Sequence, residues 1–458
     1  MADVSRFRPA SVGIVAVAFA AVLLLVVLDS TTAGTDRLLA LADFAVVDRR
    51  RPDVDCVRLR PLTRRQKVLC RDNVELMSAV VAGIRTAVDE CQNQFADARW
   101  NCGAAVASPA PTTAGRKRVG GRFDAVADVS ALKKTIRSGI REGAFLQAMI
   151  SAGMMLAVTR ACSSGTMIGC TCDRSTTTDV GAPSGDRLKR GTDAAAPTVV
   201  VDGRFDWGGC SDNVHYASAF VRTLTESGLQ HGMTTRDDDG DGRTERRRTA
   251  SAAVRLAELH NDAVGRMAVD AEMMIKCKCH GVSGSCELRT CWRSTGSVRR
   301  TGDRLHVGYE SAIKVRGVHI AGGGSSDGVD ARQELVPVLG ATASKPEVET
   351  STSTGNIDGL RRRLGDDVLV YVRSSLDFCR ADAKTGSRGT GGRVCRKIDA
   401  ETTPPPMPSE DSCAVMCCGR GHVTVKRTVA ERCRCRFTYC CSVHCETCHR
   451  TVAEHVCL

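Results

Sequence analysis

Apolar side chains recur at intervals of three and four residues from Asp72 to Phe95. This spacing places them on one face of an α-helix. Asp72 is followed three residues later by Glu75, a pattern typical of a capping box, so we expect the helix to begin there. Two further stretches, residues 131–160 and 252–275, also read as helices. The apolar positions of the first helix are Val74, Met77, Val81, Ile84, Val88, Cys91 and Phe95.

Stretches rich in Gly, Ser, Thr, Ala and charged residues separate the predicted helices. They cover residues 104–121, 174–199, 231–249 and 321–359. Such composition cannot bury a core, so we expect mobile surface insertions, the last of them within a linker between two domains. The predicted organisation is a signal peptide at 1–33, a helical N-terminal domain at 34–320, a flexible linker at 321–367 and a cysteine-rich domain at 368–458.

The chain contains 24 cysteines in 458 residues, an even number that is typical of an oxidised, secreted protein. Ten of them lie between Cys413 and Leu458. So dense a segment has little hydrophobic core and must be held by disulfides. Short runs such as 434–439 favour β-hairpins there. The predicted fold class is therefore α+β and disulfide-rich.

The N-terminus has the form of a secretory signal peptide. Arg6 and Arg8 precede an apolar run at 12–28, and Ala33 and Gly34 are small enough for cleavage. An uncleaved membrane anchor is the alternative, but the run is shorter than the ~20 apolar residues of a spanning helix. We expect export through the endoplasmic reticulum to the extracellular space and matrix.

The net charge of +12 favours a polyanionic partner. Outside the cell the main polyanions are sulfated glycans such as heparan sulfate. Nucleic acid is not expected, because the chain shows no basic motif interleaved with aromatic residues. Aromatic residues make up only 4% of the chain, so cystines must supply part of its stability.

The segment from Cys277 to Cys291 contains four cysteines. Spacing alone allows three pairings, and only the nested one, Cys277 with Cys291 and Cys279 with Cys286, keeps a simple antiparallel hairpin. Ser283 then lies in the middle of an exposed tip made of small residues. Such a hydroxyl is well placed for modification by an enzyme that grips an extended loop.

Other readings of these residues predict different chemistry. A nucleophilic Ser283 would need a Gly-x-Ser-x-Gly elbow, but the second glycine, Gly284, comes one residue early. Zinc could be held by Cys277, Cys279, His280 and Cys286, although an oxidising compartment favours disulfides. We do not expect haem at the haem-like pattern from Cys445 to His449. Nor do we expect calcium at the calcium-loop-like Asp237, Asp239 and Asp241, because Arg248 replaces the twelfth-position Glu. We expect no metal.

The block Cys277-Lys-Cys-His-Gly-Val-Ser-Gly-Ser-Cys286 resembles the hallmark of the Wnt family of secreted, lipid-modified signalling ligands. Further blocks with the same resemblance lie in order along the chain. Trp292–Arg293 and the segment 430–433 look closest to the Wnt-4 subgroup. The ordered blocks are residues 91–102, 144–162, 207–213, 377–379, 417–422 and the final cysteine cluster.

The resemblance implies a thumb and an index finger that grip the cysteine-rich domain of a Frizzled receptor. The thumb tip would carry a palmitoleoyl ester on Ser283, added by a membrane-bound O-acyltransferase, with receptor contacts from His280, Gly281, Val282 and Gly284. A lipid-shielding carrier and a co-receptor related to the LDL receptor are also implied. No enzyme activity, catalytic residue or other cofactor is expected. The index-finger contacts would be Phe437, Tyr439, Cys440, Cys441, Ser442 and Val443.

The resemblance also implies a disulfide framework beyond the thumb, including a vicinal Cys440–Cys441 bond at the index-finger tip. Cys56 with Cys70 is expected as well. The other implied pairs are Cys91–Cys102, Cys162–Cys170, Cys172–Cys210, Cys379–Cys418, Cys395–Cys413, Cys417–Cys457, Cys433–Cys448 and Cys435–Cys445.

The chain departs from the family pattern in two respects that bear on function. Gly103 removes a glycosylation sequon at Asn101, and no Asn-x-Ser/Thr occurs anywhere. Thr438–Tyr439 stands where a more aromatic pair is expected. The alternative to an acylated ligand is a secreted decoy that kept the scaffold but lost signalling, and a hydrolase using Ser283 is the third hypothesis.

Overall fold

The structure is a computed structural model of the 458-residue chain. The predicted signal peptide, residues 1–33, lies outside the part that it describes. The residues described are 38–39, 41, 56, 62–103, 126–165, 167, 169–173, 199–201, 204–229, 242–286, 289–320, 332–338, 367–382, 385–397, 409–438 and 442–458.

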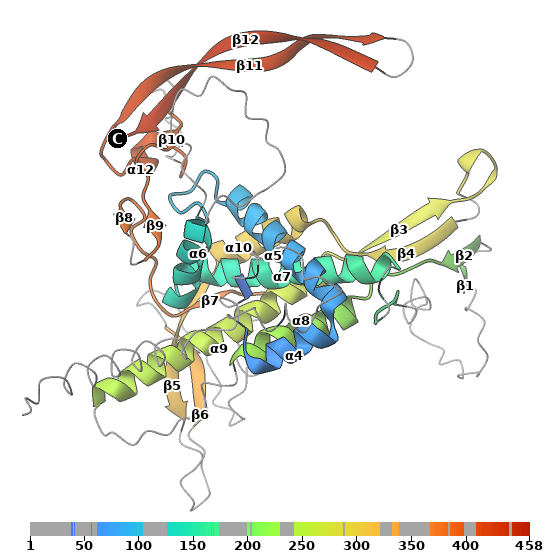
Figure 1. The fold of residues 1–458 in the computed structure, drawn as a ribbon, viewed down its shortest axis with the longest axis horizontal. Coiled ribbons are helices and arrows are strands. Elements are labelled where there is room, and N and C mark those ends of the chain that lie inside the picture. Colours follow the sequence, from blue (N-terminus) through green and yellow to red (C-terminus); the bar gives the residue numbers. More distant parts are fainter. Residues whose placement is uncertain are drawn as a thin grey trace, which may run out of the picture.

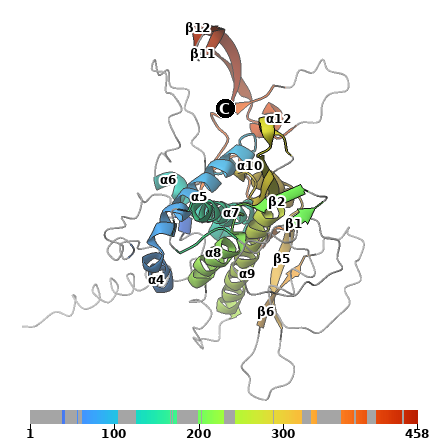
Figure 2. The ribbon, with the colours of Figure 1, turned by 90° about the vertical axis from the view of Figure 1, so that its right-hand side faces the viewer.

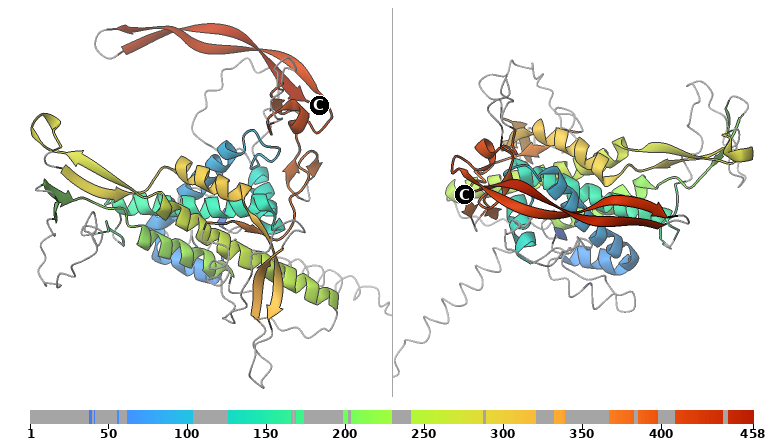
Figure 3. Two further views of the ribbon diagram at one scale, coloured as in Figure 1. Left: turned by 180° about the vertical axis from the view of Figure 1, so that it is seen from behind. Right: turned by 90° about the horizontal axis from the view of Figure 1, so that it is seen from above.

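A helical body forms the centre of the molecule, and two long β-hairpins extend from it toward the same side (Figures 1 and 3). The central helix is α7, which packs against α5, α6, α8, α9 and α10 (Figure 2). The helices are α4 (Arg64–Asp72), α5 (Val74–Gln94), α6 (Val126–Ser138), α7 (Arg141–Ser163), α8 (Val214–Leu229), α9 (Gly242–Ala271), α10 (Val298–Glu310) and α12 (Cys413–Met416).

Helix α7 occupies the centre because its sequence is apolar on every side. Among the described residues, it is the helix with the length and hydropathy to cross a membrane, yet most of it is buried by neighbouring helices. Glycines allow those helices to approach closely. A Cβ atom on Gly83 of α5 would lie 2.5 Å from the carbonyl oxygen of Gly153 in α7, and one on Gly265 of α9 would lie 2.0 Å from that of Ala148. All-round burial is typical of the core helix of a globular domain.

The predicted helices exist, but the predicted capping box at Asp72 and the unbroken helix at 131–160 were wrong. The predicted helix from Asp72 to Phe95 corresponds to α5, which begins at Val74 after an N-cap, Asn73, that makes no side-chain capping hydrogen bond. The capping box lies instead at Thr63, at the start of the separate helix α4. Thr63 and Gln66 exchange the two capping hydrogen bonds, and buried Gln66 also donates to the carbonyl of Leu224. That tertiary contact fixes the start of α4, a helix that the apolar spacing did not predict. The 131–160 helix is divided at Gly139, where φ is +65°.

The thumb hairpin belongs to a four-stranded sheet of order β1-β2-β4-β3, in which β2 runs parallel to β4. A second sheet has the order β6-β5-β7. Its strand β6 lies within the predicted linker, pairs with β5 and buries Leu335 to 3% exposure, so residues 332–337 are part of a sheet. The strands are β1 (Val199–Val201), β2 (Arg204–Gly208), β3 (Met274–Cys279), β4 (Arg289–Ser294), β5 (Ile313–Ile320), β6 (Arg332–Pro337) and β7 (Val370–Tyr371).

The C-terminal domain is a cystine-stapled base from which one long hairpin extends. Strand β11 (His422–Thr438) pairs with β12 (Ser442–Cys457), and β10 (Val394–Cys395) adds to the β12 edge at the base. A two-strand pair, β8 (Ala381–Asp382) and β9 (Ser387–Arg388), lies beside it. The buried cluster at the base of the C-terminal domain consists of Cys395, Cys413, Met416, Cys417 and Cys457. Disulfides therefore take the place of a larger apolar core.

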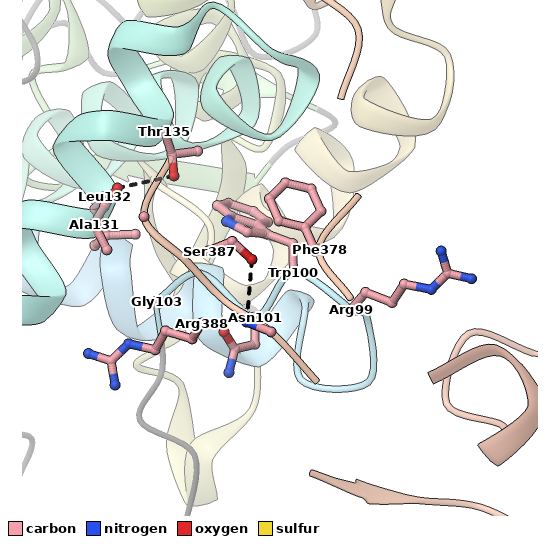
Figure 4. Close-up of a pocket in the computed structure, with 12 residues that line it drawn as sticks. Arg99, Trp100, Asn101, Gly103, Ala131, Leu132, Thr135, Phe378, Ser387 and Arg388 are labelled. Carbon is pink, nitrogen blue, oxygen red and sulfur yellow. Dashed lines mark hydrogen bonds between the residues drawn. The ribbon is translucent and has the colours of Figure 1, made fainter. Parts of the chain in front are cut away.

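The two domains are joined by polar and aromatic contacts. Glu142 in α7 is buried and accepts hydrogen bonds from Tyr309 (3.1 Å) and from Ser375 in the C-terminal domain (2.8 Å). The rings of Trp100 and Phe378 lie side by side in the wall of a small interdomain cavity (Figure 4). The cavity has a volume of about 10 Å³, about the space that one water requires. It is too small for a cofactor or substrate.

Candidate functional site

The thumb hairpin, defined as β3, β4 and the tip 280–286, carries two disulfides. In the structure Cys277 bonds to Cys291 and Cys279 to Cys286. Cys277 and Cys291 are directly opposite in the antiparallel register. The nested pairing therefore follows the ladder and clamps the tip at its root.

Ser283 stands at the summit of the tip with its side chain exposed. Its backbone is left-handed, with φ 58° and ψ 24°, and the next residue, Gly284, has φ +78°. The amide of Gly281 donates to the carbonyl of Ser285 (2.9 Å), and that of Ser285 donates back to Val282 (3.1 Å). These bonds close a tight turn, so the hydroxyl is presented on a fixed backbone rather than a free loop.

Small residues around Ser283 are required by this geometry. A Cβ atom on Gly281 would lie 2.0 Å from the Oγ of Ser285, whereas one on Gly284 would meet nothing within 4 Å. Val282 is 90% exposed. His280 turns back along the hairpin, where its Nε2 lies 2.9 Å from the Oγ1 of Thr290. The tip thus offers an accessible hydroxyl beside an exposed valine.

The root of the thumb is fixed to the helical body by Asp212, a residue that the sequence reasoning missed. One carboxylate oxygen of Asp212 accepts hydrogen bonds from the backbone amide (2.7 Å) and the hydroxyl (3.0 Å) of Thr295. The other accepts from Ser163 at the end of α7 (2.6 Å). Asp212 lies in the family-like block 207–213, which was the available signal. It orients the hairpin against the central helix.

The index finger, defined as residues 433–448, lies at the far end of the β11–β12 hairpin. A bulge between Cys433 and Arg436 shifts the register, and Arg434 within it has φ 44°. Disulfides Cys433–Cys448 and Cys435–Cys445 flank the bulge. These disulfides stabilise a part of the hairpin in which neither face is buried.

Two apolar side chains face each other near the index-finger tip. Phe437 lies opposite Val443 in the register, and they are 72% and 61% exposed. Ser442 lies opposite Thr438. Exposed large apolar groups on a narrow ribbon are typical of a partner-binding surface. The other predicted contacts at this tip, Tyr439, Cys440 and Cys441, lie outside the described residues, as does the Cys440–Cys441 bond.

The structure also contains the remaining disulfides of the implied framework, and Cys56 bonds to Cys70. The three cysteines of the possible zinc set, Cys277, Cys279 and Cys286, are all in disulfides, so this set has no free thiolates. Cys445 and Cys448 are likewise bonded, which excludes covalent haem attachment. The other pairs are Cys91–Cys102, Cys162–Cys170, Cys172–Cys210, Cys379–Cys418, Cys395–Cys413 and Cys417–Cys457.

Comparison with known proteins gives long matches. A model of the wnt family matches residues 58–458. Human protein Wnt-2b is 35% identical over 404 residues, which cover 88% of this chain and 79% of the relative. Protein Wnt-2b-A of Xenopus laevis is 33% identical over 404 residues, 88% of each chain. The suggested likeness to the Wnt-4 subgroup stays a prediction.

Solved structures are also similar. One, described as human WLS in complex with WNT8A, matches with a TM-score of 0.46 and 25% identity, over 84% of this chain and 95% of that chain. The N-terminal domain-linker of Drosophila WntD matches with a TM-score of 0.32 and 16% identity, over 66% of this chain and 98% of that chain. The family assignment rests on the sequence matches. This disulfide-stapled chain with two projecting hairpins belongs to the Wnt family, whose members are signalling ligands rather than enzymes.

Proposed function

We propose that this chain is a secreted ligand, acylated on Ser283, that grips the cysteine-rich domain of a Frizzled receptor between its thumb and index finger. The observation that carries the proposal is the exposed Ser283 hydroxyl at the summit of a doubly crosslinked tip, in a member of the Wnt family. A membrane-bound O-acyltransferase in the endoplasmic reticulum would form the palmitoleoyl ester.

The acyl chain supplies the affinity that the small tip lacks. Burying one methylene contributes ~0.8 kcal/mol, so a long chain in an apolar groove contributes on the order of 10 kcal/mol gross. The described tip offers Val282 as its exposed large apolar side chain. The same chain makes the free protein poorly soluble, so a lipid-shielding carrier is needed during secretion.

The index finger provides the second contact. Phe437 and Val443 are exposed on a ribbon that projects to the same side as the thumb (Figures 1 and 3). Two contacts on one rigid body raise affinity by making the second contact intramolecular. Signalling would follow when a co-receptor related to the LDL receptor joins the complex, and heparan sulfate would hold the ligand at the cell surface.

Co-precipitation with a Frizzled cysteine-rich domain tests the proposal. We expect Ser283→Ala to abolish receptor capture and secretion while most disulfides still form. Ser285→Ala is the matched control, since it removes the neighbouring hydroxyl of the same tip, and it should be captured normally. Normal capture of the Ser283→Ala protein would refute the proposal. Capture without reporter activation would instead favour the decoy hypothesis.

A further inference from the structure

The β11–β12 hairpin sorts its charged residues onto two faces. Directly opposite residues of an antiparallel pair share a face, and successive residues alternate. The face that we call the histidine face contains His422, Thr424, Lys426, Thr428, Ala430 and Arg432 of β11, opposite Cys457, His455, Ala453, Thr451, His449 and Thr447 of β12. The face that we call the paired face contains Val423, Val425, Arg427, Val429, Glu431 and Cys433, opposite Val456, Glu454, Val452, Arg450, Cys448 and Glu446.

All three acidic side chains of the hairpin lie on the paired face, where arginines neutralise them. Arg427 pairs with Glu454 (3.7 Å) and Arg450 with Glu431 (3.6 Å). Glu446 pairs with Arg434 of the bulge (3.4 Å). The histidine face contains no acidic residue. Its cationic side chains are therefore free of a carboxylate partner on their own face.

The histidine face is a narrow cationic strip. Lys426 and Arg432 are exposed, and so is His449, which lies between them on the neighbouring strand. Lys426 and Arg432 are six residues apart on one strand, or about 20 Å, and the whole face from His422 to Arg432 extends over about 33 Å. Exposed threonines at 424, 428, 447 and 451 lie on the same face among these cations. This spacing suits a linear polyanion more than a compact acidic patch.

We propose that the histidine face binds one sulfated glycan chain lengthwise, with its sulfates on Lys426 and Arg432. The proposal rests on the proposed secreted function and assigns its glycan contact to a particular surface. An anionic membrane is the less favoured partner, because the largest apolar residue of this face is alanine and nothing on it could insert into lipid.

Three imidazoles, those of His422, His449 and His455, lie on the histidine face among its cations. His449 lies near Arg432, while His422 and His455 contact each other at 5.4 Å between ring centroids. Thr424 lies 2.9 Å from the Nδ1 of His455. His455 also borders a cleft whose charged lining comprises Asp97, Asp411, Glu454, Arg393, Arg396 and Lys397.

Binding of the full secreted chain to a heparin-derived oligosaccharide tests the proposal. Each lost cation should weaken binding roughly fivefold, so Lys426→Gln/Arg432→Gln should weaken it roughly 25-fold at neutral pH. Arg427→Gln/Arg450→Gln removes the same charge from the paired face and should have less than a quarter of that effect. Equal losses in the two double variants would show that net charge alone binds the glycan and would overturn the proposal.

Two further readouts separate this inference from the proposed function. Ser283→Ala protein, recovered from cell extracts because its secretion is expected to fail, should bind the oligosaccharide normally. Secreted Lys426→Gln/Arg432→Gln should still capture the Frizzled domain. Binding to phosphatidylserine vesicles but not to the oligosaccharide, or equal binding to unsulfated hyaluronan, would contradict the proposal.

Discussion

The guanidinium of Arg393 donates a hydrogen bond to the carbonyl oxygen of Ala96, with Nη2 and O 2.7 Å apart. The same buried side chain donates to the carbonyls of Ala98 and Arg99. Arg393 directly precedes β10, which pairs with the base of the long hairpin, whereas the three carbonyls follow α5 in the helical domain. Burial lowers the pKa of Arg393 and the charge of Asp97 opposes that shift. Arg393 thus helps to hold the base of the long hairpin against the helical body.

Loss of the Arg393 contacts should loosen the two-pronged grip. Arg393→Met leaves three carbonyls without their donor, and charged hydrogen bonds contribute about 1.5–3 kcal/mol each, so we expect a loss of about 3 kcal/mol or more. Lys397→Gln, at an exposed cation four residues further along, should have little effect. Thermal unfolding measures the stability, and spin labels on unnatural amino acids in each hairpin measure the distance between them. An unchanged, narrow distance distribution in Arg393→Met would contradict this role.

The two glycines of the thumb tip should respond differently to alanine. Gly281→Ala places a Cβ against both the hydroxyl and the carbonyl of Ser285, so the turn cannot close and the acylated fraction should fall sharply. Gly284→Ala meets open space and costs only the strain of a positive φ, about 1 kcal/mol. Mass spectrometry of the tip peptide gives the acylated fraction. Equal acylation of the two variants would show that the acyltransferase does not require this tip conformation.

Truncation of the index finger should weaken receptor binding without affecting acylation. Phe437→Ala removes the largest exposed apolar group in the described part of that tip, and an anchor of this kind is worth about 1–3 kcal/mol. Val425→Ala, at an exposed valine nearer the base of the same hairpin, should bind normally. Titration of a soluble Frizzled cysteine-rich domain measures both. Similar affinities for Phe437→Ala and wild type would exclude Phe437 from the contact.

Acid should weaken the base of the C-terminal domain through Asp411. A hydrogen bond from Ser409, followed by the Arg396 guanidinium, holds the pKa of this carboxyl below its usual range. A depressed pKa in the folded state means that the contribution is present above the unfolded value of 3.8 and is lost as pH falls through the folded one. Asp411→Asn should therefore unfold at a lower temperature than wild type at pH 6, with the difference shrinking at pH 3. A difference independent of pH would contradict this assignment.

Local spacing made the thumb predictable, whereas tertiary contacts decided what the sequence could not show. The nested pairing of Cys277 with Cys291 follows from residues fourteen apart on one hairpin. The break at Gly139 does not, because its carbonyl accepts hydrogen bonds from the amides of Val372 and Arg373, more than 200 residues away. Strand β6 was missed because one buried leucine, Leu335, gives no periodic signal.

The anchoring of both hairpins was hidden for the same reason. Asp212 fixes the thumb through Ser163 and Thr295, and Arg393 holds the base of the β11–β12 hairpin through backbone carbonyls. A single aspartate or arginine forms no recognisable motif, and a contact to a backbone carbonyl does not depend on the residue type of the partner. The chemistry-bearing tips could be predicted because their residues are contiguous.

The acylation of Ser283 is tested most directly by mass spectrometry of the disulfide-linked peptide spanning Cys277–Cys291. The protein should be taken from the medium of cells that contain the acyltransferase and assayed in parallel for Frizzled binding. A palmitoleoyl ester on Ser283 in the receptor-bound fraction is the expected result. An unmodified Ser283 in protein that binds the receptor at full affinity would contradict the account.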